Sequence, residues 1–479
     1  MNAFILDLFK NFETENIEYC HFKSNNNLEP ALCGVDDLDL LVGSGDFDKF
    51  SEVLSKFRFR LATDRGTPPT PYVYHYFGTD PDTGLLVHLH VYFKIITGGS
   101  IYKNNSIRVE KMFLDEAFPG GEGGVFIPSA EADLILFVIR KYIEQPSIVE
   151  HFLFLKDWHN INNELQWLIN RADRIKMSNL LKKWMPELCP DLFNDCLDKL
   201  LLKSSIRARF FLGIKVRKSF VNTVRGSLYA EYTRFFQFFL AYIKNKLKMH
   251  RKNRFLFPGG LLIAFAGSEA SGKSTLSKDA AEWLAERFDV SHIHIGKPKK
   301  NWRTIPLWYL IYTYSFFKKV SKKLSRKKVV SSDSSIAINN PHPIVSWIDS
   351  IDRKYYMGKF FRKLMEGGTI ITDRYPSEFL DGPRIEPVSK LTSFLSKLEK
   401  RNYELMPHPD LVIKAEAPLE LTIERNAQRD FPEPEVFLRA RYELAKKINF
   451  PYSKMVFVKT DQEYDNSFRE VRDAIWNRT

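Results

Sequence analysis

The spacing of apolar and polar positions divides the chain into three zones. Residues 1–128 alternate short apolar runs, such as Gly84–Phe93, with Gly/Pro turns and one helical stretch, which predicts an α+β domain. Residues 129–255 repeat their apolar positions at helical spacing and predict a helical connector. Residues 256–479 alternate apolar strands with helices, the order typical of a parallel sheet. We therefore expect an α/β fold class, with three domains at these boundaries.

The composition narrows the class of protein. The chain has 479 residues, of which 44% are hydrophobic and 27% charged, and this excludes a wholly disordered, collagen-like or disulfide-stapled protein. It has no run of about 18 apolar residues, so no ordinary transmembrane helix is expected. The first residues lack the basic segment of a signal peptide. The four cysteines form no CxxC pair, which favours a reducing, cytoplasmic location.

The net charge of +13 is concentrated in two segments. Residues 203–254 contain fourteen Lys or Arg and one acid, and residues 297–332 contain eleven and no acid. The remainder of the chain carries more acidic than basic residues. Anionic partners are therefore expected to meet these two segments. No recognised RNA- or DNA-binding motif accompanies the charge, so nucleic acid is not the expected partner.

Residues 305–328 combine an apolar, aromatic-rich run of 13 residues with a cationic tail. Such a segment is too short to span a bilayer but suits an interfacial helix, with Trp308 and Tyr309 at the level of the headgroups. We expect it to bring the protein to an anionic membrane surface at the inner face, where it would help to bind a large acceptor. The alternative is helical core packing with solvated lysines, which is equally favoured for 203–254.

The most specific motif is a phosphate-binding loop, GSEASGKS, over 267–274. Its G-x-x-x-x-G-K-[ST] spacing lets backbone N–H groups turn inward around phosphate oxygens at the positive end of the following helix. An apolar strand over 261–266 leads into the loop and an amphipathic helix leaves it, so a chance match is not expected. Lys273 would supply positive charge for the β- and γ-phosphates, and Ser274 a hydroxyl for Mg²⁺.

Two later segments add candidate phosphate-binding groups. In TIITDRYP, Asp373 follows a buried strand and would hold Mg²⁺, while Arg374 would face a transferring or acceptor phosphate. A third strand, over 409–418, leads into two short helices that would close over the phosphates. These helices and the Pro/Glu break between them carry Arg425, Arg429, Arg439 and Arg441.

Residues 257–479 resemble the thymidylate kinase family of P-loop kinases. Glu269 stands at the family's acidic loop position, Asp352-Arg353 matches its helix pair 21 residues before Arg374, and the arginines above match its lid. The resemblance implies a P-loop kinase fold, ATP and Mg²⁺ as cofactors, and a homodimer. The catalytic residues it implies are Lys273, Asp373, Arg374 and Arg429. The implied cofactor-binding residues are Gly267, Glu269, Ser271, Gly272, Lys273, Ser274, Thr275 and Arg425, with Ser274 and Asp373 as metal ligands.

The acceptor is left open by this resemblance. Asp349 replaces the aromatic residue on which the family stacks its base, and the sequence after Arg374 also differs. We expect a small phosphorylated or hydroxyl acceptor, not necessarily dTMP, or a lipid-linked one. The candidate acceptor-binding residues are Glu269, Arg353, Arg374, Asp381 and Arg384. For Asp381 and Arg384, a capped surface loop is an equally favoured interpretation.

The N-terminal zone contains an alternating acidic pair. Asp37 and Asp39 lie on an apolar strand, so both carboxylates point to the same side and could hold Mg²⁺. Lys23 and Ser24 precede this strand, and a later strand carries His88 and His90. The pattern resembles an uncharacterised branch of the nucleotidyltransferase superfamily, with His88 where that superfamily has a third carboxylate and with no Gly-Gly-Ser loop. A nucleotide- or sugar-phosphate-binding remnant and a His-x-His zinc site are the alternatives.

The sequence thus predicts an ATP- and Mg²⁺-dependent phosphotransferase fused to a nucleotidyltransferase-like domain. One alternative is a bifunctional kinase and nucleotidyltransferase in the synthesis of surface polysaccharide or lipid-linked sugar. Another is a toxin-like or nucleotide-sensing module that modifies RNA or protein.

Overall fold

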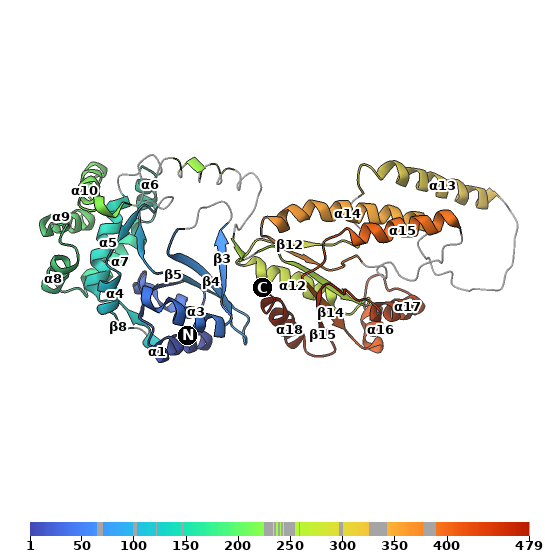
Figure 1. Ribbon diagram of the computed structural model, residues 1–479, viewed down its shortest axis with the longest axis horizontal. Helices are drawn as coiled ribbons and strands as arrows, with labels where there is room; N and C mark the ends of the chain where they lie inside the picture. Colours follow the sequence, from blue (N-terminus) through green and yellow to red (C-terminus); the bar gives the residue numbers. More distant parts are fainter. Residues whose placement is uncertain are drawn as a thin grey trace. The chain divides into compact units, whose positions relative to one another are not determined.

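The computed structural model describes residues 1–64, 70–98, 103–120, 122–144, 148–224, 254–257, 259–296, 300–324, 343–376 and 389–478, with isolated positions between 233 and 243. The chain forms two compact units, residues 1–254 and 255–479 (Figure 1). Among the described residues, no helix combines the length and the apolar character needed to cross a bilayer.

The first unit contains a mixed sheet and a group of helices. Its elements, with 3₁₀ helices labelled η, are α1 (Ala3–Thr14), β1 (Tyr19–His21), η1 (Asn25–Asn27), α2 (Glu29–Leu32), β2 (Leu38–Val42), η2 (Ser44–Asp46), α3 (Phe47–Lys56), β3 (Arg60–Asp64), β4 (Val73–Thr79), β5 (Leu86–Tyr92), β6 (Ile95–Thr97), β7 (Asn105–Ile107), α4 (Glu110–Asp115), β8 (Phe118–Pro119), η3 (Glu122–Gly124), β9 (Phe126–Ile127), α5 (Ala130–Glu144), α6 (Ile148–Lys156), α7 (Trp158–Ile169), α8 (Arg174–Trp184), α9 (Pro190–Leu201), α10 (Ile206–Ser219) and η4 (Val221–Thr223).

The strands β1-β2-β5-β4-β3 lie side by side in that order. β2 and β5 run parallel, whereas the other neighbouring pairs in this run are antiparallel. Because side chains alternate between the faces of a strand, Leu40 and Val42 of β2 enter a core with α1 and α3, whereas Leu41 enters a second core with α5. The sheet is therefore covered on both faces.

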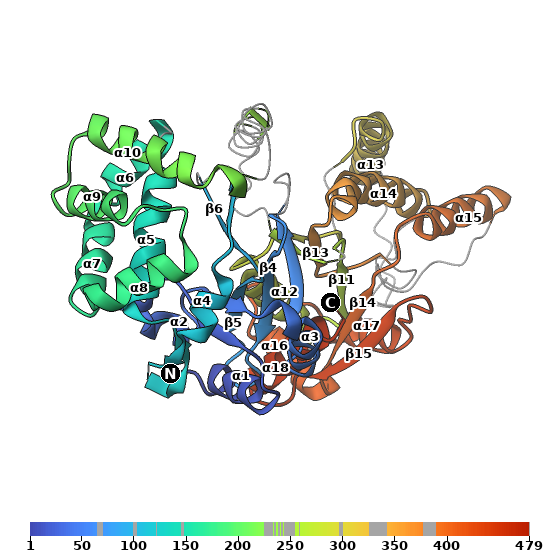
Figure 2. The ribbon, with the colours of Figure 1, turned by 60° about the vertical axis from the view of Figure 1, so that its left-hand side comes forward.

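The helices α5 to α10 are part of this first unit. α5 is buried along most of its length, and α7, α8, α9 and α10 pack around it (Figure 2). Their apolar residues share one core with Cys20, Leu41 and Tyr92 of the sheet. The segment predicted as a helical connector therefore contributes its described helices to the same compact unit as the sheet.

The second unit alternates strands and helices as the sequence predicts. Its elements are β11 (Leu262–Gly267), α12 (Lys273–Ala285), β12 (Val290–Ile293), α13 (Ile305–Leu324), α14 (Pro343–Met365), β13 (Thr369–Thr372), α15 (Lys390–Glu404), β14 (Leu411–Glu416), α16 (Leu419–Ala427), α17 (Glu435–Lys446), β15 (Lys454–Lys459) and α18 (Tyr464–Trp476); β10 (Arg254–Leu256) spans the boundary between the units in the sequence.

The sheet of the second unit is parallel throughout, with the order β12-β13-β11-β14-β15. Its central strands β11, β13 and β14 are almost wholly buried and carry apolar residues on both faces, as expected when helices cover both faces of a parallel sheet. α14 lies on one face, and α12 and α18 lie on the other (Figure 1). The chain reverses its winding around β11, and ligands of such sheets bind at the carboxyl ends of the strands beside this point.

Candidate functional site

The loop between β11 and α12 lies at the carboxyl end of the central strand. Its backbone has positive φ angles at Gly267 (143°), Ala270 (61°) and Gly272 (85°). A Cβ atom on Gly267 would lie 2.5 Å from the carbonyl oxygen of Ala415 in β14, so the close approach of these two strands requires glycine there. The Ser271 hydroxyl donates to the Ser268 carbonyl at 2.9 Å and holds the turn together. The loop ends at the N-terminus of α12, where free backbone N–H groups and the helix dipole attract anions.

Lys273, the first residue of α12, is 6% exposed. Its Nζ donates to the Ser268 carbonyl at 2.8 Å and lies 3.9 Å from Glu269 Oε2. Burial lowers the pKa of Lys273 to about 8, since removal from water disfavours the charged form. An anion in the loop would favour the protonated lysine and oppose this shift.

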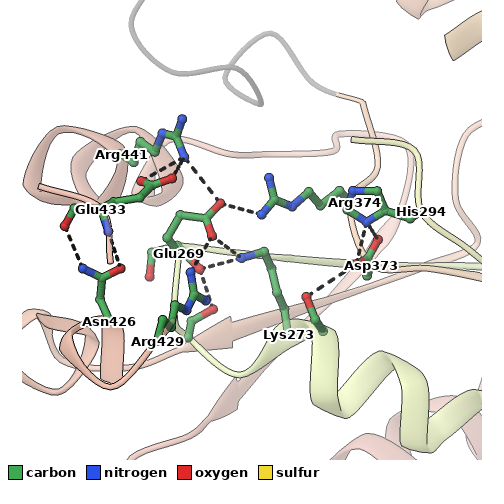
Figure 3. Close-up of polar contacts among 12 residues, drawn as sticks. Glu269, Lys273, His294, Asp373, Arg374, Asn426, Arg429, Glu433 and Arg441 are labelled. Carbon is green, nitrogen blue, oxygen red and sulfur yellow. Dashed lines mark hydrogen bonds and ion pairs between the residues drawn. The ribbon is translucent and has the colours of Figure 1, made fainter. Parts of the chain in front are cut away.

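Glu269 is the centre of an ion-pair cluster (Figure 3). Its carboxylate lies 2.7 Å from Arg374, 3.5 Å from Arg429 and 3.7 Å from Arg441. Together with Lys273, four cations thus face one carboxylate. Burial acts to raise the pKa of Glu269, but the four cations outweigh burial and hold the pKa below its usual value. Because Arg441 also pairs with Glu433 at 2.8 Å, the surplus of positive charge comes mainly from Lys273, Arg374 and Arg429, and it suits an anionic ligand.

Asp373 follows β13 and faces the first turn of α12. Its Oδ2 accepts a hydrogen bond from the Ser274 hydroxyl at 3.4 Å, and His294 Nδ1 lies 2.7 Å from Oδ1 (Figure 3). β12 and β13 run parallel, so the residues that follow these strands meet at one edge of the sheet. The contact with His294 fixes the orientation of the carboxylate beside Ser274.

The four arginines of the α16–α17 segment divide between two surroundings. Arg429 and Arg441 reach Glu269, and Arg441 also pairs with Glu433 at 2.8 Å. Arg425 instead donates to the Thr460 carbonyl at 2.7 Å. Arg439 pairs with exposed Glu435 on its own helix and lies outside the cluster.

Arg353 lies in the interior of the unit. It is 2% exposed, and its guanidinium donates to the Gly296 carbonyl at 2.9 Å and to the Tyr403 hydroxyl at 2.7 Å. Asp352 accepts hydrogen bonds from Asn301 N and from Trp308 Nε1, both at 2.9 Å. Asp352 and Arg353 therefore fix the segment between β12 and α13, and Asp352 also binds Trp308 of that helix. The predicted acceptor residues Asp381 and Arg384 lie outside the described residues.

Two cavities border the loop. A cavity of about 40 Å³ lies among the charged residues Glu269, Lys273, Asp373, Arg374 and Arg441. A second, of about 350 Å³, is lined by Gly267 and Ser268, by the end of β14 and the residues after it, and by α17. The loop thus has open space beside it as well as the ion-pair cluster.

In the first unit, each predicted aspartate is paired with a predicted histidine. Asp39 lies opposite His90 in the parallel β2–β5 register, with 2.9 Å between Oδ1 and Nδ1. Asp37 Oδ1 lies 2.6 Å from His88 Nδ1. Lys23 Nζ is 3.5 Å from Asp39 Oδ1, whereas Ser24 has a positive φ of 54° and lines the adjoining cavity.

Burial and these pairings together shift the pKa values of the groups involved. Burial acts to raise the pKa of Asp39, but Lys23 and His90 outweigh burial and hold it well below its usual value. Burial lowers the pKa of Lys23 to about 7 and that of His90 to about 4. Among the described residues, no group of three or more His, Cys, Asp or Glu side chains is arranged to hold a metal ion. The zinc interpretation therefore has no third ligand in that part of the chain.

The sequence did not predict a role for several residues that contribute to the site of the second unit. His294 orients Asp373, and the Thr460 hydroxyl donates to the Ser271 carbonyl at 3.0 Å. Asn426 binds the backbone of Glu433 and so fixes the turn between α16 and α17. The signal that could have identified each of them is its position at the end of a predicted strand or helix.

Comparison with known proteins finds distant relatives. The chain is 22% identical over 233 residues to the uncharacterized ATP-binding protein YghR of Escherichia coli K12, a match that covers 45% of this chain and 86% of the relative. YghR of E. coli O6:H1 gives the same values. The uncharacterized ATP-binding protein YghS of E. coli K12 is 27% identical over 152 residues, which cover 30% of this chain and 62% of that protein. No family model matches the chain.

Proposed function

We propose that residues 255–479 bind ATP with Mg²⁺ and transfer its γ-phosphoryl group to a small acceptor. The observation that carries the proposal is the cluster of Lys273 and three arginines around Glu269, at the helix N-terminus where a polyphosphate would lie. The relatives YghR and YghS, whose names describe ATP binding, support the choice of nucleotide.

Lys273 would bind the β- and γ-phosphates, with the backbone N–H groups from Gly267 to Thr275 around them. Ser274 and Asp373 fit a Mg²⁺ ion, because a hydroxyl and a carboxylate are hard oxygen donors and lie 3.4 Å apart. When bound, the metal would neutralise charge on the phosphates. His294 would keep the Asp373 carboxylate turned toward the metal.

The arginines would stabilise the transferring phosphoryl group. Arg374 and Arg429 approach Glu269 from different elements, so both can meet negative charge that develops between donor and acceptor. Arg425, bound to Thr460, would lie on the nucleotide side. The cofactor-binding set would also include Ser271, whose hydroxyl shapes the loop.

The resemblance to thymidylate kinase-like P-loop kinases supports an acceptor site beside Glu269 and Arg374. Arg353, Asp381 and Arg384 stay candidates for that site, with Arg353 acting through the loop that it holds. The acceptor would be a small phosphorylated or hydroxyl compound, or a lipid-linked one. The homodimer implied by the resemblance also stays a prediction.

Label transfer from γ-³²P-ATP tests the proposal with the full chain. The acceptors would be nucleoside monophosphates, sugar phosphates and lipid-linked sugars, each with Mg²⁺. We expect one acceptor class to be labelled by the native protein and by Lys278→Ala, which removes an exposed lysine of the same helix. Lys273→Ala should abolish labelling while the protein stays folded. Label transfer that survives Lys273→Ala would contradict the proposal.

We also propose that the predicted segment 305–328, of which the structure describes 305–324 as α13 and residues 325–328 lie outside the described residues, carries the protein to an anionic membrane surface. Tyr309 and Tyr314 are both 69% exposed and Phe317 is 68% exposed, and they lie on one helix with further exposed apolar residues, Leu310 and Phe316. Exposed apolar side chains gathered on one element are typical of an interaction surface. The adjoining lysines supply the charge that an anionic surface attracts. Trp308, bound to Asp352, would anchor the helix to the unit and not reach the headgroups.

The first unit retains its resemblance to the nucleotidyltransferase superfamily as a prediction. A bifunctional enzyme would need Asp37 and Asp39 for a metal-bound nucleotide, and both carboxylates accept contacts from histidines. Release of pyrophosphate from a nucleoside triphosphate, lost in Asp39→Asn, would favour that alternative.

A further inference from the structure

The Glu269 carboxylate contacts the cations that the proposed function assigns to phosphate. It lies 2.7 Å from Arg374, 3.5 Å from Arg429 and 3.9 Å from Lys273 Nζ (Figure 3). The oxygen atoms of a phosphate group would need the same N–H groups. A bound phosphate and the carboxylate of Glu269 therefore compete for one set of partners.

The space among these charged groups is small. The cavity lined by Glu269, Lys273, Arg374 and Arg441 has a volume of about 40 Å³, which holds about three water molecules at most. The larger cavity that borders Gly267 is not lined by Lys273 or by any of the three arginines around Glu269. A phosphate group could therefore meet these cations only by taking the place of Glu269.

Lys273 can exchange its ion pair with Glu269 without losing its other contact. Its Nζ donates to the Ser268 carbonyl at 2.8 Å, and an ammonium group has three N–H donors, so two remain for another partner. The Glu269 side chain rotates about several single bonds. Its carboxylate can therefore leave the cations while the backbone of the loop stays in place.

Arg441 has a second carboxylate beside it. Glu433 lies 2.8 Å from Arg441, closer than Glu269 at 3.7 Å. Asn426 exchanges two hydrogen bonds with the backbone of Glu433, at 2.8 and 3.2 Å, and these bonds fix the turn. Departure of Glu269 would therefore leave Arg441 neutralised and expose the other three cations.

Displacement of Glu269 opposes the binding of any phosphate group. Glu269 is 9% exposed, and the cations around it hold its pKa below the usual value, so it is ionised at neutral pH. A ligand that replaces it must compensate for the lost ion pairs. One phosphate group supplies about two negative charges at most, against three cations, whereas a polyphosphate supplies more and also contacts the N–H groups of the loop.

We propose that Glu269 is an internal counter-ion that a polyphosphate must displace from Lys273, Arg374 and Arg429, and that this exchange excludes inorganic phosphate from the nucleotide site. The inference rests on the nucleotide site proposed above and assigns Glu269 a part in its specificity. The carboxylate keeps the cations together before a ligand arrives and returns to them when the product leaves.

Titration calorimetry of the full chain tests the inference with inorganic tripolyphosphate and inorganic phosphate, both without Mg²⁺. Glu269→Gln keeps the size and shape of the side chain and removes its charge. We expect this variant to bind tripolyphosphate at least about tenfold more tightly than the native protein does, because a negative charge no longer competes with the ligand. Inorganic phosphate should gain affinity by a similar factor.

The matched control is Glu282→Gln, which removes the same charge from an exposed position on α12. Its affinities should stay within about twofold of the native values. Thermal unfolding adds a measurement that does not need a fully folded variant. Tripolyphosphate should raise the unfolding temperature of Glu269→Gln more than that of the native protein, because stabilisation by a ligand grows with its affinity. A purely structural role for Glu269 predicts the opposite sign, since a loosened site would bind more weakly.

Three results would each overturn the inference. The first is that tripolyphosphate binds the native protein through Lys273, as judged by Lys273→Ala, but binds Glu269→Gln no more tightly; this removes the counter-ion and leaves the nucleotide site. The second is an equal gain in Glu282→Gln, which would assign the effect to net charge. The third is that neither the native protein nor Glu269→Gln binds tripolyphosphate, which would remove the nucleotide site as well.

Discussion

At the scale of single residues, the charge of Lys273 depends on pH near neutrality. Because burial lowers its pKa to about 8, the ligand-free protein loses this charge as the pH rises above 8. Bound polyphosphate would keep the lysine protonated. Nucleotide binding should therefore be linked to uptake of a proton.

We predict that the affinity for Mg²⁺-ATP falls by about tenfold per pH unit above about pH 8. Calorimetry in buffers of different ionisation enthalpy measures both the affinity and the proton taken up. Lys273→Arg, whose charge does not titrate in this range, should show no such fall. A wild-type affinity that stays constant to about pH 9.5 would contradict the role given to Lys273.

Glu269 stabilises the second unit by neutralising part of the arginine cluster. We expect Glu269→Gln to lower the free energy of unfolding by about 1–3 kcal/mol at neutral pH. Glu282→Gln, which removes one partner of an exposed pair with Lys278, should cost less than about 1 kcal/mol. Urea unfolding of both variants measures the difference.

The pH dependence of this effect has a definite sign. Since the cations hold the pKa of Glu269 below its usual value, its stabilisation is fully present above about pH 4.3 and is lost as the pH falls toward the folded-state pKa. The difference between the native protein and Glu269→Gln should shrink in acid. A difference that grows as the pH falls would contradict the cluster.

At the scale of elements, the two glycines of the loop make different demands. A Cβ at Gly267 would lie 2.5 Å from the Ala415 carbonyl oxygen, whereas the nearest atom to a Cβ at Gly272 is 3.8 Å away. Gly272→Ala should therefore lower the free energy of unfolding only by the strain of its left-handed backbone, about 1–2 kcal/mol. Gly267→Ala should lower it clearly more, because β11 and β14 must separate. Thermal unfolding without nucleotide compares the two variants, and an equal loss of stability in both would contradict the close approach of the strands.

α13 gives a second prediction at this scale. Replacing Tyr309, Tyr314 and Phe317 with serine should reduce binding to vesicles that contain phosphatidylserine by at least about tenfold, because each large apolar side chain contributes about 1.5–3 kcal/mol when buried. Tyr452→Ser, at an exposed aromatic elsewhere in the unit, serves as the control. Flotation with vesicles measures the change. Unchanged flotation would remove the membrane proposal.

The elements were more predictable from the sequence than the contacts between them. The apolar runs before Gly267, at 369–372 and at 411–416 predict β11, β13 and β14, because a parallel sheet covered on both faces needs continuous apolar strands. The contacts of His294 and Thr460 were not predictable, since they depend on which strand ends lie side by side. The inclusion of α5 to α10 in the first unit likewise depends on a shared core that spacing alone does not reveal.

The residue pattern also predicted more of the candidate site in the second unit than of the contacts in the first unit. Spacing singled out the loop and Lys273, and the position after a buried strand singled out Asp373; the structure brings these residues together at the carboxyl ends of β11 and β13. Spacing did not separate Arg441, which reaches Glu269, from Arg439, which does not, because both lie on one helix and only its orientation distinguishes them. In the first unit, the hydrogen bond from Asn25 to Asp133 joins residues more than 100 positions apart, a contact that spacing does not reveal.

At the scale of the whole molecule, the two units should respond separately to ligands. We predict that Mg²⁺-ATP slows amide hydrogen exchange in 267–275 and in the α16–α17 segment, and leaves α7 unchanged. Exchange of the full chain, followed by mass spectrometry, resolves these segments. Slowed exchange in α7 and η1 instead would move the nucleotide to the first unit.

The most direct test of the central claim is the equilibrium affinity of the full chain for Mg²⁺-ATP. We predict saturable binding of one nucleotide by the native protein and by Lys278→Ala, and binding about 100-fold weaker in Lys273→Ala, a loss of roughly 2.7 kcal/mol. Equal affinities in the native protein and Lys273→Ala would contradict the claim that the loop at the end of β11 holds the nucleotide.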